Sequence, residues 1–327
     1  MQELLILYLS YKTDKRLKTI MVRDNISIAV ATYNGGKYLR DQLESLVNQS
    51  TRANEIIVCD DGSTDDTLSI LAEYENKGLL KFFVNEHSLG VKKNFEQAVT
   101  KCTGQYIALC DQDDVWHPTK LQFSIEKMKQ IEYERLPCLV YTDLEIVDQK
   151  LNMIEHSFWK YLRVHPEKES FHTLLYGNTI TGCTVLLNSA FKHYIKNIPN
   201  SASMHDAWVG LIAFGLGKTG AVTESTVKYR RHDKNITSVV GISAFGRLVR
   251  TLSLIIKEIK NPSFLELELS QAELFLEAYG SLLTLDKLDD LNKFLVNRDQ
   301  GFLIRKTKAY IAKRLPNIFN LLMKNSI

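Results

Sequence analysis

The sequence predicts an α/β protein with a doubly wound, mostly parallel sheet, helices on both faces and a C-terminal helical extension. Between residue 26 and about residue 238, short apolar runs alternate with segments whose apolar residues recur at helical spacing. Three of the apolar runs end in acidic or glycine-containing turns, as is typical of the carboxyl edge of an open α/β sheet. From about residue 243 onward the spacing of apolar residues is helical.

The alternation assigns each element in order. The strands expected in the first half are residues 26–31, 55–59, 80–84, 105–110 and 138–142. The helices expected between them are residues 38–47, 67–74, 91–99 and a segment that begins near Pro118, since proline is favoured in a first helical turn. After an irregular stretch that ends near residue 180, the second half is expected to contain an extended segment at 184–187, a helix at 207–214 and an extended segment at 226–229.

Length and composition bound the domain organisation. The chain has 327 residues, of which 45% are hydrophobic, and this suffices for one large core with a smaller appendage. We therefore expect an N-terminal extension at residues 1–24, a main domain at 25–242 and a helical region at 243–327. The formal net charge is +3, too close to balance to indicate a nucleic-acid partner.

The cysteines and the apolar runs indicate in which cellular environment the protein works. Five cysteines are present without a C-x-x-C pair, which favours buried reduced thiols over disulfides or a zinc site. No apolar run reaches the roughly 18 residues that a membrane-spanning helix needs. We expect a cytoplasmic protein.

The first twenty residues do not resemble a signal peptide, because their basic cluster follows the apolar segment 4–9 instead of preceding it. Met21 directly precedes the first convincing strand. We hypothesise that translation begins at Met21, and the intact mass of the protein from its native host tests this; a species that retains Met1 contradicts it.

The acidic triplet Asp111-Gln112-Asp113 is the most informative motif. It follows the apolar run 106–110, so the expected strand delivers carboxylates to its carboxyl end. Carboxylate oxygens are ligands that Mg²⁺ and related hard cations prefer. The triplet therefore predicts a divalent cation, Mg²⁺ or Mn²⁺, that holds a diphosphate.

Two further strand ends are expected beside the triplet. One is Ala31-Thr32-Tyr33-Asn34 followed by two glycines, which is neither a G-x-G-x-x-G motif nor a P-loop. This disfavours a dinucleotide oxidoreductase or an ATPase. The other is Asp60-Asp61-Gly62, whose acceptors suit a base and a ribose, although an aspartate before glycine is also common in ordinary turns.

Taken together, these motifs resemble the family 2 glycosyltransferases with the GT-A fold over about residues 26–238. The resemblance is carried by the segments ATYNGGKYL, VCDDGSTDDT, LGVKKNFEQA, CDQDDVWHPTKL, MHDAW and YRRHDKN. Within that family, DQDDVW, VYTDL, TGCTVLLN, HDAW and YRRHDKN look most like bacterial rhamnosyltransferases that build cell-surface polysaccharide. The resemblance implies inverting transfer of a sugar from a nucleoside diphosphate donor to an acceptor hydroxyl.

The resemblance also implies site residues. Asp113, Asp111 and His232 would form the metal site, and Asp206 would be the catalytic base, although an aspartate that begins a helix is equally an ordinary cap. The nucleotide sugar would be held by Ala31, Thr32, Tyr33, Asn34, Asp60, Asp61, Lys93, Asp111, Gln112, Arg230 and Arg231, with Asp60 favoured for the base. The acceptor side would include Thr181, Gly182, His205 and Trp208.

The last 23 residues form a basic amphipathic segment without acidic residues. Such a segment either lies on anionic lipid or packs on the domain. Lipid-linked acceptors are common in the family, so we expect peripheral contact with the inner face of the cell membrane and a glycan or lipid-linked acceptor.

Other functions remain as alternatives. The resemblance makes dTDP-rhamnose the first candidate for the donor. A UDP-hexose is the alternative, because the two share the requirements for a base site and a metal site. A catalytically silent sugar-nucleotide-binding scaffold would be expected to lose the triplet or the base, and both are present. A nucleotidyltransferase or a haloacid-dehalogenase-like phosphatase would carry a glycine-rich basic segment or D-x-D-x-T near the first strand, and neither occurs.

Overall fold

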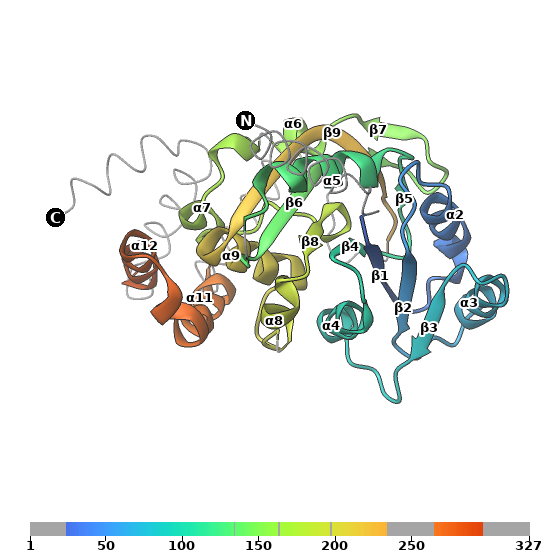
Figure 1. The fold of residues 1–327 in the computed structure, drawn as a ribbon, viewed down its shortest axis with the longest axis horizontal. Helices are drawn as coiled ribbons and strands as arrows, with labels where there is room; N and C mark the ends of the chain where they lie inside the picture. Colours follow the sequence, from blue (N-terminus) through green and yellow to red (C-terminus); the bar gives the residue numbers. More distant parts are fainter. Residues whose placement is uncertain (1–23, 134, 163, 197, 234–264, 297–327) are drawn as a thin grey trace, which may run out of the picture.

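The structure is a computed structural model that describes residues 24–133, 135–162, 164–196, 198–233 and 265–296 (Figure 1). Residues 1–23, 243–264 and the basic segment at the carboxyl terminus lie outside the described residues. The domain boundaries and the start at Met21 therefore stay predictions.

A nine-stranded mixed sheet forms the centre of the protein. Its strand order is β3-β2-β1-β4-β8-β6-β9-β5, and β7 pairs with β6. The strands are β1 Ile26–Thr32, β2 Glu55–Asp60, β3 Lys81–Val84, β4 Tyr106–Cys110, β5 Val115–Trp116, β6 Cys138–Val147, β7 Met153–Glu155, β8 Leu186–Asn188 and β9 Lys218–Arg230. Strand β8 is antiparallel to β4 and β6, β7 is antiparallel to β6 and β5 is antiparallel to β9, whereas the remaining pairs are parallel.

Helices cover both faces of this sheet. They are α2 Gly36–Val47, α3 Thr67–Asn76, α4 Val91–Lys101, α5 Lys120–Ile131, α6 Phe158–Leu162, α7 Phe171–Leu175, α8 Phe191–Ile195, α9 His205–Leu216, α11 Glu266–Tyr279 and α12 Leu285–Leu295. Three short 3₁₀ turns are also present, η1 Pro166–Lys168, η2 Gly182–Thr184 and η3 Gly280–Leu282.

Strand β1 has apolar side chains on both faces of the sheet, so helices must pack on both faces. Ala29 and Ala31 belong to a core cluster with residues of α4 and α9, whereas Ile28 and Val30 belong to a second cluster with residues of α2 and α5. A strand that is buried on both faces has a continuous apolar sequence, as residues 26–31 do. The predicted α/β fold with helices on both faces is confirmed.

The site lies where the winding direction reverses. Strand β1 pairs in parallel with β2 on one side and with β4 on the other. The chain passes from β1 through β2 to β3 and then returns to the opposite side of β1 to form β4. At such a reversal the two loops that leave the strands diverge, and ligands of open α/β sheets bind in that crevice.

Two elements differ from the sequence-based expectation. The segment expected to be extended at 184–187 begins as the turn η2, because both the amide and the Oγ1 hydroxyl of Thr184 donate to the carbonyl of Thr181. Strand β9 has 13 residues where only 226–229 were expected. Its first half contains the polar run Thr223-Glu224-Ser225, of which the first two are exposed, so apolar periodicity does not reveal it.

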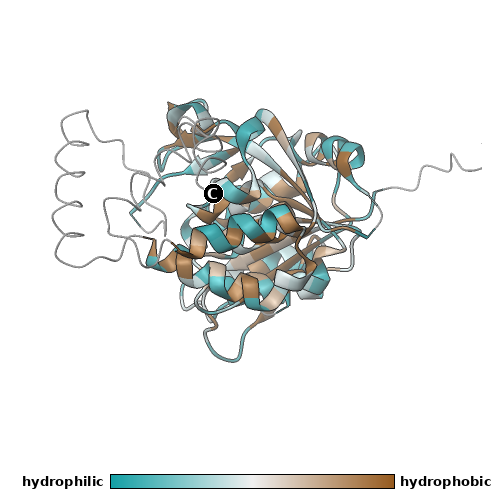
Figure 2. Cartoon of the chain, turned by 90° about the vertical axis from the view of Figure 1, so that its left-hand side faces the viewer, coloured by the Kyte–Doolittle hydropathy of each residue, from teal (hydrophilic) through white to brown (hydrophobic). Residues whose placement is uncertain are grey.

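The C-terminal helices α11 and α12 pack at one end of the domain. Phe275 of α11 contacts Phe171 and Trp208, at ring-centroid distances of 5.6 and 5.7 Å. Seen from that end, the helices at the front present hydrophilic and hydrophobic residues on different faces (Figure 2). None of the helices in the described ranges combines the length and apolar character that crossing a bilayer requires.

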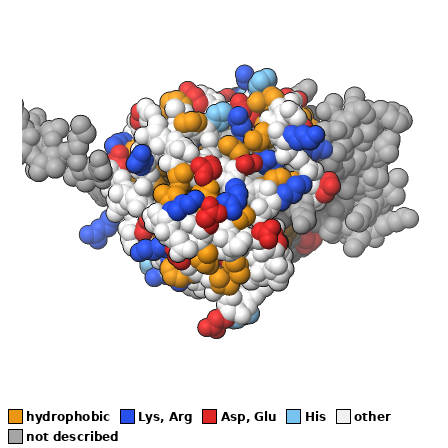
Figure 3. Space-filling model, turned by 90° about the vertical axis from the view of Figure 1, so that its right-hand side faces the viewer, with side chains coloured by type: hydrophobic (Ala, Val, Ile, Leu, Met, Phe, Trp, Pro, Cys, Tyr) orange, Lys and Arg blue, Asp and Glu red, His pale blue; other side chains and the backbone are white. Residues whose placement is uncertain are grey.

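The opposite end carries mixed charge. On this face, basic and acidic side chains lie interspersed with hydrophobic ones (Figure 3). Glu73 of α3 illustrates the mixture, since its carboxylate forms ion pairs with Arg40 at 2.6 Å and Lys77 at 2.8 Å.

Candidate active site

The loop between β4 and β5 carries the acidic triplet at the carboxyl edge of the sheet. Asp111 directly follows β4, and β5 begins at Val115. Strand β5 pairs with the end of β9, with Val115 opposite Lys228. This pairing brings the acidic loop beside the residues that follow β9, which are more than 100 positions later in the chain.

His232 and Asp113 meet at this junction. The Nε2 atom of His232 lies 2.8 Å from Oδ2 of Asp113. The imidazole also stacks on the Tyr38 ring of α2, with centroids 5.0 Å apart and planes 26° apart. The stacking leaves the ring little freedom, so the structure fixes an imidazole nitrogen beside a carboxylate, which are two common ligand types for divalent metals.

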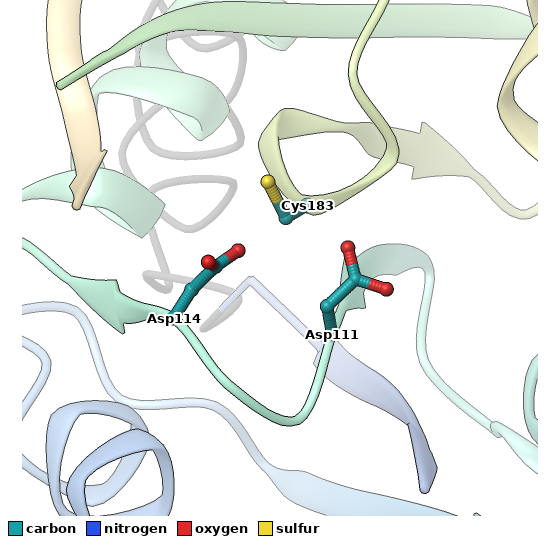
Figure 4. A group of neighbouring side chains, drawn as sticks. All are labelled: Asp111, Asp114 and Cys183. Atoms are coloured by element: carbon teal, nitrogen blue, oxygen red, sulfur yellow. The ribbon is translucent and has the colours of Figure 1, made fainter. Parts of the chain in front are cut away.

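Asp111 and Asp114 point from the same loop toward the Cys183 thiol of η2 (Figure 4). One ligand atom from each of these three residues lies within 4.8 Å of the others. Burial raises the pKa of Asp111, and the negative charges of Asp113 and Asp206 raise it further. Burial and the charges of Asp113 and Asp111 raise the pKa of Asp114 in the same way.

This crowding of carboxylates is the observation that fits a cation. Several acidic groups face one another in a buried setting, and a divalent cation placed among them would relieve their repulsion. Asp111, Asp113 and His232 could hold it, in agreement with the donor types that Mg²⁺ or Mn²⁺ accepts. Asp114 and Cys183 lie deeper, since both are fully buried.

Asp206 stands at the first turn of α9. Its Oδ2 accepts a hydrogen bond from the Gly182 amide at 3.2 Å, and its Oδ1 accepts one from the Ala207 amide at 2.6 Å. Burial raises the pKa of Asp206 to about 6 despite these hydrogen bonds. A carboxylate with a pKa near neutrality is suited to general base catalysis.

His205, which precedes Asp206, is buried in the core. Its ring is 3% exposed and stacks on Phe95 with centroids 4.0 Å apart. Burial lowers the pKa of His205 to about 3, so the imidazole is neutral at physiological pH. A Cβ atom added to Gly182 would lie 2.6 Å from His205 Nε2, so only glycine permits this packing.

The end of β1 is linked to the acidic loop through Gln112. Its Oε1 accepts from the Tyr33 amide at 2.8 Å, and its Nε2 donates to the Tyr33 carbonyl at 3.0 Å. A Cβ atom on Gly35 would lie 2.2 Å from Gln112 Oε1, which explains the glycine at this position. The side-chain amide of Gln112 thus pairs with the backbone groups that were expected to face a nucleotide.

Asp60 and Asp61 both organise loops. Asp60 is fully buried and accepts hydrogen bonds from Thr32 Oγ1, the Gly62 amide and both the amide and the hydroxyl of Ser63, at 2.6–3.1 Å. The Asp61 carboxylate accepts from the Asn85 and Ser88 side chains and from the amides of Leu89 and Gly90, at 2.7–2.9 Å. The loop before α4 is therefore held to the end of β2.

A family model for glycosyl transferase family 2 matches residues 27–194, which is more than half of the 327-residue chain. The chain belongs to glycosyl transferase family 2. It is therefore a glycosyltransferase by family, and the site described above lies largely within the matched range.

Curated relatives support the assignment to this family of glycosyltransferases. The putative teichuronic acid biosynthesis glycosyltransferase TuaG of Bacillus subtilis is 29% identical over 218 residues, which are 65% of this chain and 81% of TuaG. Chondroitin synthase of Escherichia coli is 34% identical over 134 residues, which are 41% of this chain. The match covers only 19% of that longer synthase.

A solved structure confirms the predicted GT-A fold. Residues 1–349 of S. aureus TarS, crystallised with UDP-GlcNAc, superpose with a TM-score of 0.60 at 19% identity. The superposition covers 91% of this chain and 75% of the TarS chain. At this identity the likeness concerns the fold alone.

The remaining residues expected in the glycosyltransferase site contact other groups of the protein. Lys93 forms an ion pair with Glu96 at 2.8 Å. The Arg231 amide donates to the Val147 carbonyl. Ala31 is part of the sheet, and the Asn34 Oδ1 atom accepts from the Thr64 amide.

Two residues that were expected to contact the ligand are buried in the protein. Trp208, expected on the acceptor side, is 1% exposed and packs edge-on against Phe275, so it contacts the core. The Arg230 guanidinium, expected at the phosphates, bonds instead to the Asp41 carboxylate and to backbone carbonyls.

Sequence reasoning assigned no role to Tyr38 or Asp114. Asp114 extends the triplet to D-x-D-D, so its position in the motif could have marked it. Tyr38 enters the site from α2, and no local signal in the sequence links it to the acidic loop.

Proposed function

We propose that this glycosyltransferase moves a sugar from a nucleoside diphosphate donor to an acceptor hydroxyl by an inverting, metal-dependent mechanism. The observation that carries the proposal is the convergence of Asp111, Asp113, His232 and Asp206 at the carboxyl edge of the sheet. The proposal is supported by the charge of Asp206, which raises the pKa of Asp111, after burial and the charge of Asp113. One end of the site is thus equipped to hold a diphosphate and the other to accept a proton.

On the donor side, Asp111, Asp113 and His232 would hold Mg²⁺ or Mn²⁺. The bound ion would neutralise negative charge on the departing diphosphate. Residues 31–34, of which Tyr33 is exposed, and the β2 turn with Asp60 and Asp61 would contact the base and the ribose. Since Asp60 is buried, we infer that it acts by shaping that turn.

On the acceptor side, Asp206 would accept the proton of the attacking hydroxyl. The acceptor oxygen forms a bond to the anomeric carbon while the bond from that carbon to the diphosphate oxygen breaks, and its electron pair leaves with the diphosphate. Attack from the face opposite the leaving group inverts the anomeric configuration. Gly182 and Thr181 would shape the acceptor pocket around the base.

We propose dTDP-rhamnose as the donor, on the strength of the motifs DQDDVW and YRRHDKN. A UDP-hexose is the second candidate, and it is favoured by the TarS complex with UDP-GlcNAc. Incubation with dTDP-, UDP- and GDP-sugars, followed by chromatography of the released nucleoside diphosphate, tests the choice. Selective turnover of dTDP-rhamnose supports the first candidate; turnover of a UDP-hexose in its place supports the second.

We further propose that the acceptor is a polysaccharide or a lipid-linked glycan and that the protein works at the cytoplasmic face of the cell membrane. The support is the basic amphipathic segment at the carboxyl terminus, where each Lys or Arg near anionic lipid contributes about 1 kcal/mol. Co-sedimentation with vesicles that contain phosphatidylserine tests this. Full binding by a protein that lacks residues 305–327 would contradict it.

A further inference from the structure

Arg230 ends strand β9 with its guanidinium in the interior of the protein. The residue is 2% exposed. Its Nε donates to the Asp113 carbonyl at 2.9 Å, one terminal nitrogen donates to the Gln149 carbonyl at 2.8 Å, and the other donates to Asp41 Oδ2 at 2.8 Å. All three nitrogens of the guanidinium therefore have partners inside the protein.

The backbone of Arg230 also forms a hydrogen bond to the acidic loop. Its amide donates to Asp114 Oδ1 at 3.0 Å. Asp113 and Asp114 are thus each bonded to Arg230, one through its carbonyl and the other through its carboxylate. Because Asp114 is fully buried, loss of this contact would leave a buried carboxylate without its backbone donor.

Tyr38 joins Arg230 to His232. The guanidinium lies over the Tyr38 ring at 4.6 Å from its centroid, and the His232 imidazole stacks on that ring at 5.0 Å. His232 in turn contacts Asp113. Arg230 therefore supports the carboxylate through the loop backbone and the imidazole through an aromatic ring.

We propose that the side chain of Arg230 is a positioning group for the metal ligands Asp113 and His232. The proposal rests on the proposed function, since it presumes that these two residues hold the cation. A phosphate ligand would direct N–H groups toward an open site, whereas the guanidinium of Arg230 is buried and bonded to the residues that shape the metal loop. Residues that orient metal ligands affect metal affinity without touching the metal.

The test compares Arg230→Met with Arg40→Met, which removes the same charge from an exposed arginine paired with Glu73. Mn²⁺ affinity is measured by electron paramagnetic resonance in the presence of dTDP, the nucleoside diphosphate of the proposed donor, because free Mn²⁺ gives a signal that binding removes. We expect Arg230→Met to weaken Mn²⁺ binding by roughly 10- to 100-fold. Arg40→Met should change it less than about twofold, as exposed ion pairs contribute little.

Arg230→Lys keeps the buried charge. This variant replaces Arg230→Met in the test if the methionine variant does not fold. Lysine lacks the planar fork that reaches three partners, so we expect it also to weaken Mn²⁺ binding, with a melting temperature between those of Arg230→Met and the unaltered protein. In a His232→Ala background the Arg230 substitution should have a smaller effect, because the two residues act on one site.

Three results separate the possibilities. If Arg230→Met binds Mn²⁺ as tightly as Arg40→Met does, Arg230 does not position the ligands and the inference is overturned. If instead Arg230→Met loses dTDP affinity in the presence of EDTA but keeps its Mn²⁺ affinity, the arginine is a direct phosphate ligand and the inference is overturned. If the unaltered protein binds neither Mn²⁺ nor any of dTDP, UDP and GDP, the proposed function itself fails.

Discussion

His232 and Asp113 are 119 positions apart in the chain, and the imidazole Nε2 lies 2.8 Å from the carboxylate Oδ2. The pairing of β5 with β9 produces this contact, because the acidic loop enters β5 and His232 lies two residues beyond the end of β9. The contact joins the two halves of the glycosyltransferase domain at the edge where a diphosphate would bind.

His232→Ala should therefore weaken metal-dependent nucleotide binding. We expect the Mn²⁺ affinity to fall more than about tenfold, which corresponds to about 1.4 kcal/mol. Isothermal titration with Mn²⁺ in the presence of dTDP measures the change. His87→Ala, which alters an exposed histidine, is the control and should bind as the unaltered protein does; equal affinities for the two variants would remove His232 from the site.

Donor turnover should depend on pH through Asp206. Burial raises the pKa of this carboxyl to about 6, and a base acts only when deprotonated. The rate should be nearly constant above pH 7 and should fall about tenfold per pH unit well below pH 6. Release of nucleoside diphosphate between pH 4.5 and 8.5 gives the profile, and a rate that rises toward acid would refute the assignment. Asp206→Asn should abolish the activity at every pH.

Asp61→Ala should lower the stability of the fold more than it lowers the rate of sugar transfer. Burial opposes ionisation of Asp61, but the hydrogen bonds from Leu89, Asn85, Ser88 and Gly90 outweigh it and lower its pKa. The substitution leaves these donors without their acceptor, so we expect a loss of about 1–3 kcal/mol in the free energy of unfolding. A depressed pKa stabilises the fold above the unfolded value, and this contribution disappears as pH falls through the folded value. Urea denaturation should thus show a smaller difference below about pH 4.

Gly182→Ala should disturb the base without removing it. The added Cβ atom would lie 2.6 Å from His205 Nε2, and the His205 ring is held in place by Phe95. We expect a loss of about 1–3 kcal/mol in stability from overpacking, together with a lower turnover rate, because the Gly182 amide bonds to the Asp206 carboxylate. Thermal denaturation and donor turnover measure the two effects. An unchanged rate would show that this turn does not position Asp206.

The sequence predicted well the elements whose local pattern decides their structure. Strands such as β1 and β4 are buried on both faces, so their apolar runs identify them directly. The helix α2 and the strand ends near Thr32, Asp60 and Cys110 follow from the same alternation. Strand β9 was predicted only at its carboxyl end, because its earlier part depends on pairing with β6, which is far away in the sequence. The polar residues Thr223 and Glu224 lie at a register shift of that pairing, between Val222 and Ser225.

The candidate site was predicted as a set of motifs but not as a set of contacts. The neighbours of Arg230 show the difference: Asp41, Asp113 and Gln149 come from three separate segments. An arginine beside a histidine at a strand end resembles a phosphate ligand, and only the fold shows that its guanidinium points inward. The same holds for Trp208, whose burial depends on the packing of α9 against α11.

The central claim is that the acidic loop binds a metal that holds a nucleoside diphosphate sugar. The most direct measurement is thermal stabilisation by dTDP-, UDP- and GDP-sugars, with and without Mn²⁺ or Mg²⁺, for the unaltered protein and for Asp113→Ala. We predict a rise in melting temperature with one class of donor that requires the metal and is lost in Asp113→Ala. Stabilisation that is independent of the metal, or that persists in Asp113→Ala, would contradict the claim.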